Sequence, residues 1–341
     1  MSNHALSDYY RILEGEDRAK YLRTKEYNVA VGPADNEHSL WNAHDSVITR
    51  DALTSEGISF LDLKVELAHR MLDSCILCER RCGAKRSAGE KGHCGVLEPR
   101  ISSEFIHMGE EPDLVPSYTI FFSGCTFECV FCQNWDISTA PTSGVRVSPD
   151  KVARMIENRV ASKHPGGPRL RNAHFARNVN WVGGDPTSNL PFILEVLTEC
   201  NANIPQAWNS NMYQTEESLK LLDGVIDVYL TDFKYGNDKC ALRLSNAPDY
   251  WRIVGRNHRL ARAQAEMIVR HLVLPGHVEC CTRPILNWIA ENLSNVKVNV
   301  MAQYRPSHRA KEFKDIDRPL EMSEYRKAEE IADSLGLDLC D

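Results

Sequence analysis

Runs of apolar, β-prone residues alternate with amphipathic stretches from residue 117 onward. The apolar runs lie at residues 118–123, 178–182, 206–209, 225–231, 268–274 and 296–301. In the stretches between and after them, apolar residues recur every three or four positions, which predicts helices. The predicted helices cover residues 149–162, 190–200, 216–222, 238–246, 282–292 and 322–335, with Ser148 and Thr215 as N-caps. Near-continuous apolar strands that alternate with helices are typical of parallel βα units.

Six βα units are too few for a complete eight-stranded barrel. They fit a partial (β/α)6 TIM-like barrel or an open parallel sheet, and either fold binds ligands at the carboxyl ends of its strands. Before residue 115 the pattern differs, and it predicts short helices at residues 8–24 and 62–72 with a loop at 31–37 between them. We therefore predict an α/β chain with a helical, cysteine-rich lobe at residues 1–114 and a partial barrel at residues 115–341.

The composition narrows the class of protein. The chain has 341 residues, of which 43% are hydrophobic, and this is enough to bury a large core without disulfides. No apolar run approaches the roughly 20 residues that span a bilayer, and the N-terminus lacks the apolar segment of a secretory signal. The net charge of −7 argues against nucleic acid as a partner, because nucleic-acid binding depends on neutralising phosphates. We expect a cytoplasmic protein without a membrane partner.

The chain contains 12 cysteines, and their clustering indicates metal binding. In a reducing compartment, grouped cysteines hold metals more often than they form disulfides. One group is Cys75, Cys78, Cys82 and Cys94, a second is Cys125, Cys129 and Cys132, and the others are scattered at Cys200, Cys240, Cys280, Cys281 and Cys340. The vicinal pair Cys280–Cys281 is typical of packing, whereas near a cluster it would be a candidate hydrogen-atom donor.

The first group has the spacing C-x2-C-x3-C-x11-C. Four thiols at such spacing suit tetrahedral zinc, mononuclear iron or an auxiliary iron–sulfur cluster. A redox-active disulfide is the alternative, since a C-x2-C pair alone is also a dithiol motif. We predict a second metal in this segment and leave its identity open.

The second group, C-x3-C-x2-C, follows the first predicted strand directly. Three thiolates on a tight loop can hold three irons of a [4Fe–4S] cluster, and the fourth iron then stays open to a ligand. An electron-transfer cluster or a structural zinc site normally has four protein ligands. The triplet therefore favours a catalytic cluster on Cys125, Cys129 and Cys132.

This triplet, after the first strand of a six-unit β/α chain, resembles that of the radical S-adenosylmethionine (radical SAM) superfamily. The resemblance implies that the open iron binds S-adenosyl-L-methionine. It also implies that the reduced cluster cleaves this cofactor into methionine and a 5′-deoxyadenosyl radical, which abstracts hydrogen from a substrate. A low-potential electron donor such as flavodoxin or ferredoxin is implied as a partner.

Further residues resemble the superfamily's cofactor-binding pattern. The turn Gly183-Gly184-Asp185-Pro186 after the second strand is similar to the GGEP motif that binds the cofactor's amino group, with an aspartate that is one methylene shorter. The same four residues are also ordinary turn chemistry. Phe131 occupies the position of the aromatic residue that lies near adenine in the superfamily.

Two strand ends resemble those of glycyl-radical-enzyme activases. Asp232 and Lys234 match a D-x-K pattern that contacts the cofactor or a cation, and the period of a strand places both on one face. An ordinary surface ion pair is the alternative. Arg270 matches an arginine that reaches the cofactor carboxylate, and a guanidinium can grip a carboxylate with two hydrogen bonds. His271 points to the other face, as a packing residue would.

Three more residues lie where strands end. Asn209 closes the third strand, and Tyr304 and Arg305 follow the last one. Because ligands bind at the carboxyl ends of the strands, these three are candidate cofactor contacts. His107, with Glu110 and Glu111, is typical of a salt-bridged turn, and a metal or acid–base group is the alternative.

A narrower resemblance rests on several co-linear motifs. They are S-C-I-L-C at 74–78, G-E-E-P at 109–112, D-F-K-Y at 232–235, R-H-L-V-L-P-G at 270–276 and Q-Y-R-P at 303–306. Together they resemble the PflX-like family of relatives of the pyruvate formate-lyase activating enzyme. This resemblance implies an activating-enzyme-like oxidoreductase that takes hydrogen from a backbone glycine of a partner protein or modifies a protein in another way.

Two other functions stay open at this point. A radical SAM enzyme with a small-molecule substrate would need no protein partner. A non-catalytic iron–sulfur or zinc protein would transfer electrons or dock partners, but such a carrier normally closes the fourth ligand position.

Overall fold

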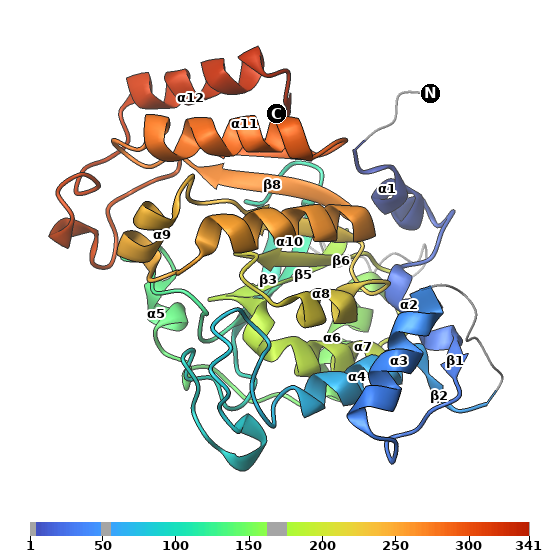
Figure 1. Cartoon of the computed structure of the whole chain (residues 1–341). Coiled ribbons are helices and arrows are strands. Elements are labelled where there is room, and N and C mark those ends of the chain that lie inside the picture. Colours follow the sequence, from blue (N-terminus) through green and yellow to red (C-terminus); the bar gives the residue numbers. More distant parts are fainter. Residues whose placement is uncertain (1–4, 49–55, 162–175, 341) are drawn as a thin grey trace.

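The computed structural model describes residues 5–48, 56–161 and 176–340, and its centre is an eight-stranded sheet. The strand order is β10-β9-β8-β7-β6-β5-β4-β3. Figure 1 labels β3, β5, β6 and β8 of this sheet. The six predicted strands are confirmed as β4 (Ser117–Phe122), β5 (Asn178–Gly183), β6 (Gln206–Ser210), β7 (Val228–Asp232), β8 (Glu266–Leu272) and β9 (Lys297–Met301). The sequence pattern does not predict the two edge strands, β3 (Ile101–His107) and β10 (Asp338–Leu339).

The strand order shows how the sheet is wound. Strands β4 to β9 lie side by side in chain order and are all parallel, without the reversal of a doubly wound sheet. β3 runs antiparallel to β4 and β10 runs parallel to β9, and within the described residues these two edges do not pair with each other. The fold is therefore α/β with a mainly parallel sheet, consistent with a partial TIM-like barrel that is open along one side.

Helices cover the outer face of this sheet. The predicted ones are confirmed as α6 (Pro149–Ala161), α7 (Leu190–Glu199), α8 (Glu216–Leu222), α9 (Asp238–Ser245), α11 (Arg283–Asn292) and α12 (Met322–Ser334), and α10 (Tyr250–Gln264) adds an unpredicted one. Shorter helical turns form α5 (Trp135–Ser138), η2 (Pro186–Asn189), η3 (Val278–Thr282) and η4 (Ala310–Glu312). The Thr215 side chain accepts a hydrogen bond from the Ser218 amide, which confirms this N-cap of α8. Over the described residues, no helix has both the length and the apolar character needed to cross a membrane.

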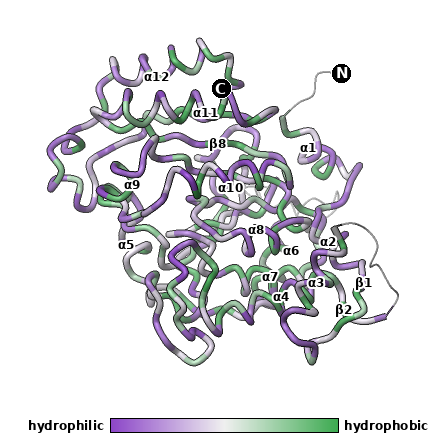
Figure 2. Tube along the Cα trace, in the orientation of Figure 1, coloured by the Kyte–Doolittle hydropathy of each residue, from purple (hydrophilic) through white to green (hydrophobic). Residues whose placement is uncertain are grey.

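The main core lies between the sheet and these helices. Trp181 and Trp208 face each other across β5 and β6 and are fully buried. The Trp181 indole donates a hydrogen bond to Gln206 at 2.9 Å, so its polar atom is satisfied. Figure 2 shows α7 as a mostly hydrophobic segment, whereas α12 alternates between hydrophilic and hydrophobic residues at the edge of the molecule.

The N-terminal segment wraps around the barrel. It forms α1 (Ser7–Glu14), α2 (Lys20–Glu26), β1 (Asn28–Val29), α3 (Glu37–Ile48), β2 (Ile58–Ser59), α4 (Phe60–Arg70) and η1 (Arg86–Ala88). The helix predicted at 8–24 is in fact two helices, because Gly15 ends α1 in the left-handed conformation, with φ of 79°. α4 packs against α7, and β3 joins the main sheet. The division at residue 114 stays a prediction.

Helix α1 closes the amino ends of the strands. Leu6 and Tyr9 pack on Val228 and Ile268, and the Tyr9 hydroxyl accepts a hydrogen bond from Asn178 at 3.0 Å. Figure 1 shows α1 beside the beginning of β8. Since this end of the barrel is filled, a ligand site is left to the carboxyl ends.

Glu266, the first residue of β8, anchors α1. Its carboxylate accepts hydrogen bonds from the backbone amides of Asp8 and Tyr9, both at 2.8 Å. Glu266→Ala leaves these amides without their acceptor, and we expect α1 to be loosened by about 1–3 kcal/mol. Hydrogen exchange of residues 7–14 should become faster, whereas Glu14→Ala, on the exposed end of α1, should leave it unchanged. Equal exchange in wild type and Glu266→Ala would contradict this anchoring.

Candidate active site at the carboxyl ends of the strands

The loop after β4 presents the cysteine triplet at the carboxyl ends of the strands. Gly124 begins this loop with φ of 89°, and a Cβ at this position would lie 2.3 Å from the Val96 side chain. The loop then closes on itself, since the Cys132 amide donates to the Cys129 carbonyl at 3.1 Å. All three cysteines are free and half-buried.

Each of the three sulfurs has a polar neighbour. The Phe127 amide donates to Cys125 Sγ at 3.4 Å, and the Ser245 hydroxyl donates to Cys129 Sγ at 2.9 Å. Cys132 Sγ lies 3.4 Å from the Ser138 hydroxyl. Hydrogen bonds to cysteine sulfurs are one of the means by which proteins tune iron–sulfur clusters.

The spread of the sulfurs distinguishes a cluster from a single ion. Two thiolates on one tetrahedral zinc lie about 3.8 Å apart, whereas each cysteine of a [4Fe–4S] cluster binds a different iron. In the described parts of the chain, the three sulfurs do not form a group whose members all lie within 4.8 Å of one another. The chemistry and spacing of Cys125, Cys129 and Cys132 therefore fit a polynuclear cluster better than a zinc ion.

The G-G-D-P turn packs directly against the cysteine loop. The Gly184 amide donates to the Phe122 carbonyl at 2.9 Å, and the Asp185 amide donates to the Gly124 carbonyl at 3.1 Å. A Cβ on Gly183 would lie 2.2 Å from the Phe122 oxygen, and one on Gly184 would lie 2.1 Å from the Gly124 oxygen. Both glycines are thus required for this approach, which places the turn beside the cysteines as expected.

The Asp185 carboxylate is already used inside the protein. Its oxygens accept hydrogen bonds from the amides of Thr187 and Asn211, both at 3.0 Å, and from the Ser210 hydroxyl at 3.1 Å. Burial raises its pKa, which these hydrogen bonds oppose. Asp185 therefore ties the end of β5 to the end of β6, and its predicted contact with the cofactor amino group stays a prediction.

Asn209 lies near the end of β6, and Asn211 follows this strand. The side-chain amide of Asn211 donates a hydrogen bond to the Thr126 hydroxyl at 3.0 Å and lies 3.9 Å from Cys125 Sγ. Asn209 is buried in the strand beside Leu230. Of the two, Asn211 is the one in contact with the cysteine loop.

Asp232 and Lys234 form an ion pair at the site and not on an open surface. Their side chains are 27% and 20% exposed, and Lys234 Nζ lies 2.6 Å from the Asp232 carboxylate. Burial would lower the pKa of Lys234, but Asp232 and the thiols of Cys129 and Cys132 raise it overall. Conversely, burial raises the pKa of Cys129 to about 11, and Lys234 acts against this. An ammonium group at this place offsets part of the negative charge of a thiolate-bound cluster.

Arg270 is half-buried among carboxylates of the chain itself. Its Nε and Nη2 each lie 2.7 Å from Glu111, and Nη2 also pairs with Glu110. His107 lies 3.0 Å from Glu110. Burial raises the pKa of Glu110, but Arg270 and His107 lower it by more, to about 2. This confirms the salt-bridged turn. The role of Arg270 in holding the cofactor carboxylate stays a prediction, because two glutamates now occupy its guanidinium.

A cavity of about 440 Å³ lies beside this network. Glu110, Glu111, Arg270, Asn299, Gln303 and Tyr325 are among its lining residues. These residues come from the segment after β3, from β8 and β9, and from α12, so the cavity lies on the open side of the barrel.

Aromatic side chains line the candidate site near Cys132. Phe131 is buried and contacts Tyr304 with ring centres 5.9 Å apart. The Tyr304 hydroxyl donates to the Ile316 carbonyl, which fixes the ring. Arg305 is exposed. The structure therefore brings Phe131 and Tyr304 together, and Arg305 lies outside this wall.

The N-terminal cysteine group lies partly inside the protein. Cys75 and Cys78 are buried, whereas Cys82 is exposed and Cys94 is half-buried. Burial raises the pKa of the Cys78 thiol, and the charges of the other three cysteines raise it further, so the four thiols lie near one another and the identity of their metal stays open. The neighbouring Arg80 guanidinium donates to the Thr126 carbonyl at 3.1 and 3.2 Å, so this segment braces the catalytic cysteine loop.

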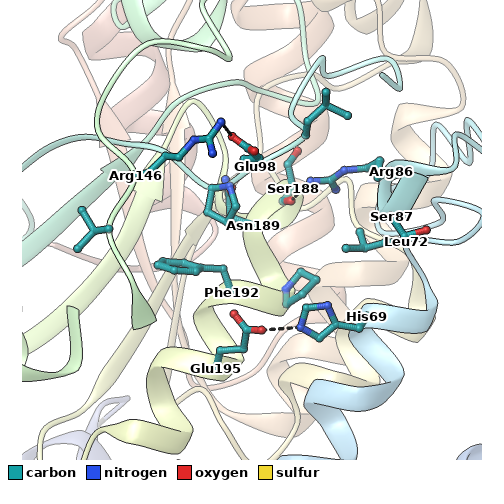
Figure 3. A pocket seen from close by; sticks show the side chains of 14 residues that line it. His69, Leu72, Arg86, Ser87, Glu98, Arg146, Ser188, Asn189, Phe192 and Glu195 are labelled. Carbon is teal, nitrogen blue, oxygen red and sulfur yellow. Dashed lines mark hydrogen bonds and ion pairs between the residues drawn. The ribbon is translucent and has the colours of Figure 1, made fainter. Parts of the chain in front are cut away.

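A second cavity, of about 430 Å³, lies outside the barrel (Figure 3). In this view the His69–Glu195 and Glu98–Arg146 pairs lie on either side of Phe192. None of the predicted cofactor residues lines this cavity. One of its lining residues, Ser188, comes two positions after the G-G-D-P turn. It is therefore separate from the candidate active site.

The contacts of the Ser245 and Ser138 hydroxyls with the cysteine sulfurs could not be predicted from the sequence. Ser245 lies 116 residues after the cysteine that it contacts, and it reaches Cys129 because α9 ends beside the cysteine loop. The amides of Glu128 and Val130 donate to the carbonyls of Ser245 and Leu244, at 3.1 and 2.9 Å. No local motif marks such a contact, so only the folded structure reveals it.

Comparison with known proteins decides the family. The radical SAM superfamily matches this chain over residues 119–289, which include the cysteine loop, the G-G-D-P turn and Arg270. Uncharacterized protein MJ0674 of Methanocaldococcus jannaschii is 42% identical over 348 residues, and the match covers 98% of each chain. This chain belongs to the radical SAM superfamily. The superfamily predicted from the cysteine spacing is thus confirmed, and with it the [4Fe–4S] cluster and S-adenosylmethionine as the family's cofactors.

Solved structures give more distant matches to this radical SAM protein. Streptococcus suis SuiB bound to S-adenosylmethionine is 13% identical with a TM-score of 0.45. That match covers 63% of this chain and 47% of SuiB, so this chain spans less than half of that one. Methylornithine synthase (PylB) is 12% identical with a TM-score of 0.44, and the match covers 97% and 77% of the two chains.

The Ser245 contact predicts a change in the reduction potential of the cluster. Removing a hydrogen bond to Cys129 Sγ destabilises the more negative, reduced state, so Ser245→Ala should lower the potential. A loss of about 1 kcal/mol corresponds to about 40 mV for one electron. A redox titration followed by electron paramagnetic resonance measures this shift. Ser143→Ala is the matched control, because this hydroxyl binds Ala140 and Ser123 instead of a cluster sulfur. An unchanged potential in Ser245→Ala would refute the contact.

Proposed function

We propose that this radical SAM enzyme acts on a partner protein, as an activating-enzyme-type oxidoreductase of the PflX-like kind. The carrying observation is the placement of Cys125, Cys129 and Cys132 at the carboxyl ends of a parallel sheet, against the G-G-D-P turn and Lys234. When bound, the cluster and S-adenosylmethionine supply a one-electron reduction and a carbon-centred radical. The task of the chain is to hold, orient and enclose them.

Named residues of the chain would divide this task. The three cysteines would hold the cluster, and the neighbouring hydroxyls of Ser245 and Ser138 would set its electronic environment. Glycines 183 and 184 let the turn approach the cluster loop closely, so that its backbone borders the cofactor site. Phe131 and Tyr304 form an apolar wall that excludes water from one side.

The open side of the barrel supports a large substrate. β3 and β10 do not pair in the part of the chain that the structure describes, so the sheet does not enclose its carboxyl ends completely. An extended polypeptide segment could enter there. The resemblance of D-F-K-Y and R-H-L-V-L-P-G to activase motifs supports the same substrate class.

A small-molecule substrate is the second candidate, and one observation favours it. The cavity of about 440 Å³ on the open side has the volume of an ordinary small-ligand site. Arg270, Asn299 and Gln303 among its lining residues would suit a small polar or charged molecule.

The remaining partners follow from the redox chemistry. A low-potential flavodoxin or ferredoxin would reduce the cluster, and a reducing compartment such as the cytoplasm would keep the thiols available. In agreement with this, all twelve cysteines are free. We also propose that the N-terminal group Cys75, Cys78, Cys82 and Cys94 holds an auxiliary iron–sulfur cluster, since four thiolates are the usual ligands of such a cluster and the other three cysteines lie close enough to Cys78 to raise its pKa.

A fractionation experiment tests the substrate class. The reconstituted enzyme is incubated anaerobically with S-adenosylmethionine and dithionite, and 5′-deoxyadenosine is measured with and without fractions of anaerobic lysate. The macromolecular fraction should stimulate product formation several-fold, and trypsin treatment of that fraction should abolish the effect.

Two variants serve as controls for the formation of 5′-deoxyadenosine. Cys129→Ala should form no 5′-deoxyadenosine above background, whereas Cys200→Ser, which changes a cysteine outside all groups, should behave as wild type. Stimulation by the small-molecule fraction alone would reject the protein substrate in favour of the second candidate. Equal product from wild type and Cys129→Ala would reject the enzyme assignment itself.

A further inference from the structure

A third group of metal-binding side chains lies outside the catalytic loop. It consists of Cys240 in the first turn of α9, His277 after β8, and Cys280 and Cys281 in η3. Cys240, His277 and Cys281 are buried, and Cys280 is exposed. The segment between β8 and α11 thus folds over the start of α9 and brings together residues that are far apart in the sequence.

The distances match those of ligands around one tetrahedral ion. His277 Nδ1 lies 3.6 Å from Cys240 Sγ, 3.4 Å from Cys280 Sγ and 3.7 Å from Cys281 Sγ. The sulfurs of Cys280 and Cys281 are 3.9 Å apart. Zinc–sulfur bonds of about 2.3 Å and a zinc–nitrogen bond of about 2.0–2.1 Å, at tetrahedral angles, place S and N about 3.6 Å apart and two sulfurs about 3.8 Å apart.

Hydrogen bonding alone does not explain this arrangement. A neutral imidazole nitrogen carries either one N–H or one lone pair, so it can satisfy one thiol. Here three sulfurs converge on the same nitrogen of His277. Convergence of this kind is expected when all four atoms face one cation.

The surroundings of His277 support a metal ligand. Its other nitrogen, Nε2, lies 2.9 Å from the Asp315 carboxylate, which turns Nδ1 toward the sulfurs. Carboxylates commonly orient metal-binding histidines in this way. Arg243 in turn binds Asp315, with Nη1 3.0 Å from Oδ1. Its positive charge offsets the negative charge of Asp315, so three thiolates and a divalent ion would leave the whole group with a net charge of −1.

The backbone is also shaped around the group. η3 is a π-helical turn, a rare conformation that occurs often at functional sites. A Cβ on Gly236 would lie 2.8 Å from the Cys280 oxygen, so only glycine fits there. Asn237 accepts from the Cys240 amide and donates to the Cys280 carbonyl, both at 2.8 Å. Asn237 therefore links the two elements that carry the cysteines.

We propose that Cys240, His277, Cys280 and Cys281 form a structural zinc site. Three thiolates and one imidazole in a closed tetrahedron are typical ligands of structural zinc. The site would anchor α9, whose first turn carries Cys240 and whose last residue, Ser245, contacts the catalytic Cys129. The zinc site would thus fix α9, which supports the cysteine loop, without taking part in the reaction.

Metal analysis of the reconstituted protein tests this site. Zinc and iron per chain are measured by mass spectrometry in wild type, Cys280→Ser and the control Cys200→Ser. Wild type and control should retain one zinc that Cys280→Ser loses, and iron should stay the same in all three. X-ray absorption at the zinc edge of the wild type should show three sulfur ligands and one nitrogen ligand. This second measurement needs no variant and remains valid if Cys280→Ser folds poorly.

Three results of the metal analysis would contradict the zinc site. Undiminished zinc in Cys280→Ser, zinc with four sulfur ligands, or iron in place of zinc at this site would each overturn the proposal. Replacing Cys125, Cys129 and Cys132 together should remove iron and leave this zinc in place. A failure of the zinc site is therefore distinguishable from a failure of the proposed radical function.

Discussion

The candidate active site depends on backbone hydrogen bonds that continue the β4–β5 pairing beyond the ends of the strands. The Gly184 and Asp185 amides bind the carbonyls of Phe122 and Gly124, and the lack of Cβ atoms on the two motif glycines allows this close approach. The G-G-D-P turn is thereby held against the cysteine loop. Because each later strand pairs in parallel with the one before it, Asp232 and Arg270 arrive at the same end of the sheet.

The segments outside the barrel support this arrangement from several directions. Helix α1 fills the amino ends of the strands, which leaves the carboxyl ends for chemistry. Arg80, from the N-terminal cysteine segment, and Ser245, from the end of α9, both contact the catalytic loop. The cysteine loop is thus held by segments that precede and follow it in the chain, as a site needs when its geometry must be kept within a fraction of an ångström.

The parts of the fold that could be predicted are those with a local signal. The six parallel strands are near-continuous apolar runs, and the catalytic cysteines have a diagnostic spacing. β3 could not be predicted because one of its faces is exposed and its sequence is largely polar. α10 could not be predicted because the polar residues Asn257 and His258 interrupt its buried face. The contacts of Ser245 with Cys129 and of Cys240 with His277 join residues 116 and 37 positions apart. Such contacts depend on how crossover helices pack, and no sequence period encodes them.

The central claim is that three cysteines hold a cluster whose remaining iron is open to the cofactor. Electron paramagnetic resonance of the reduced, reconstituted protein tests it most directly, with spectra recorded before and after addition of S-adenosylmethionine. We expect the cofactor to change the cluster signal in wild type, and we expect the joint replacement of Cys125, Cys129 and Cys132 to remove that cofactor-sensitive signal. A fully loaded cluster whose spectrum does not respond to S-adenosylmethionine would contradict it.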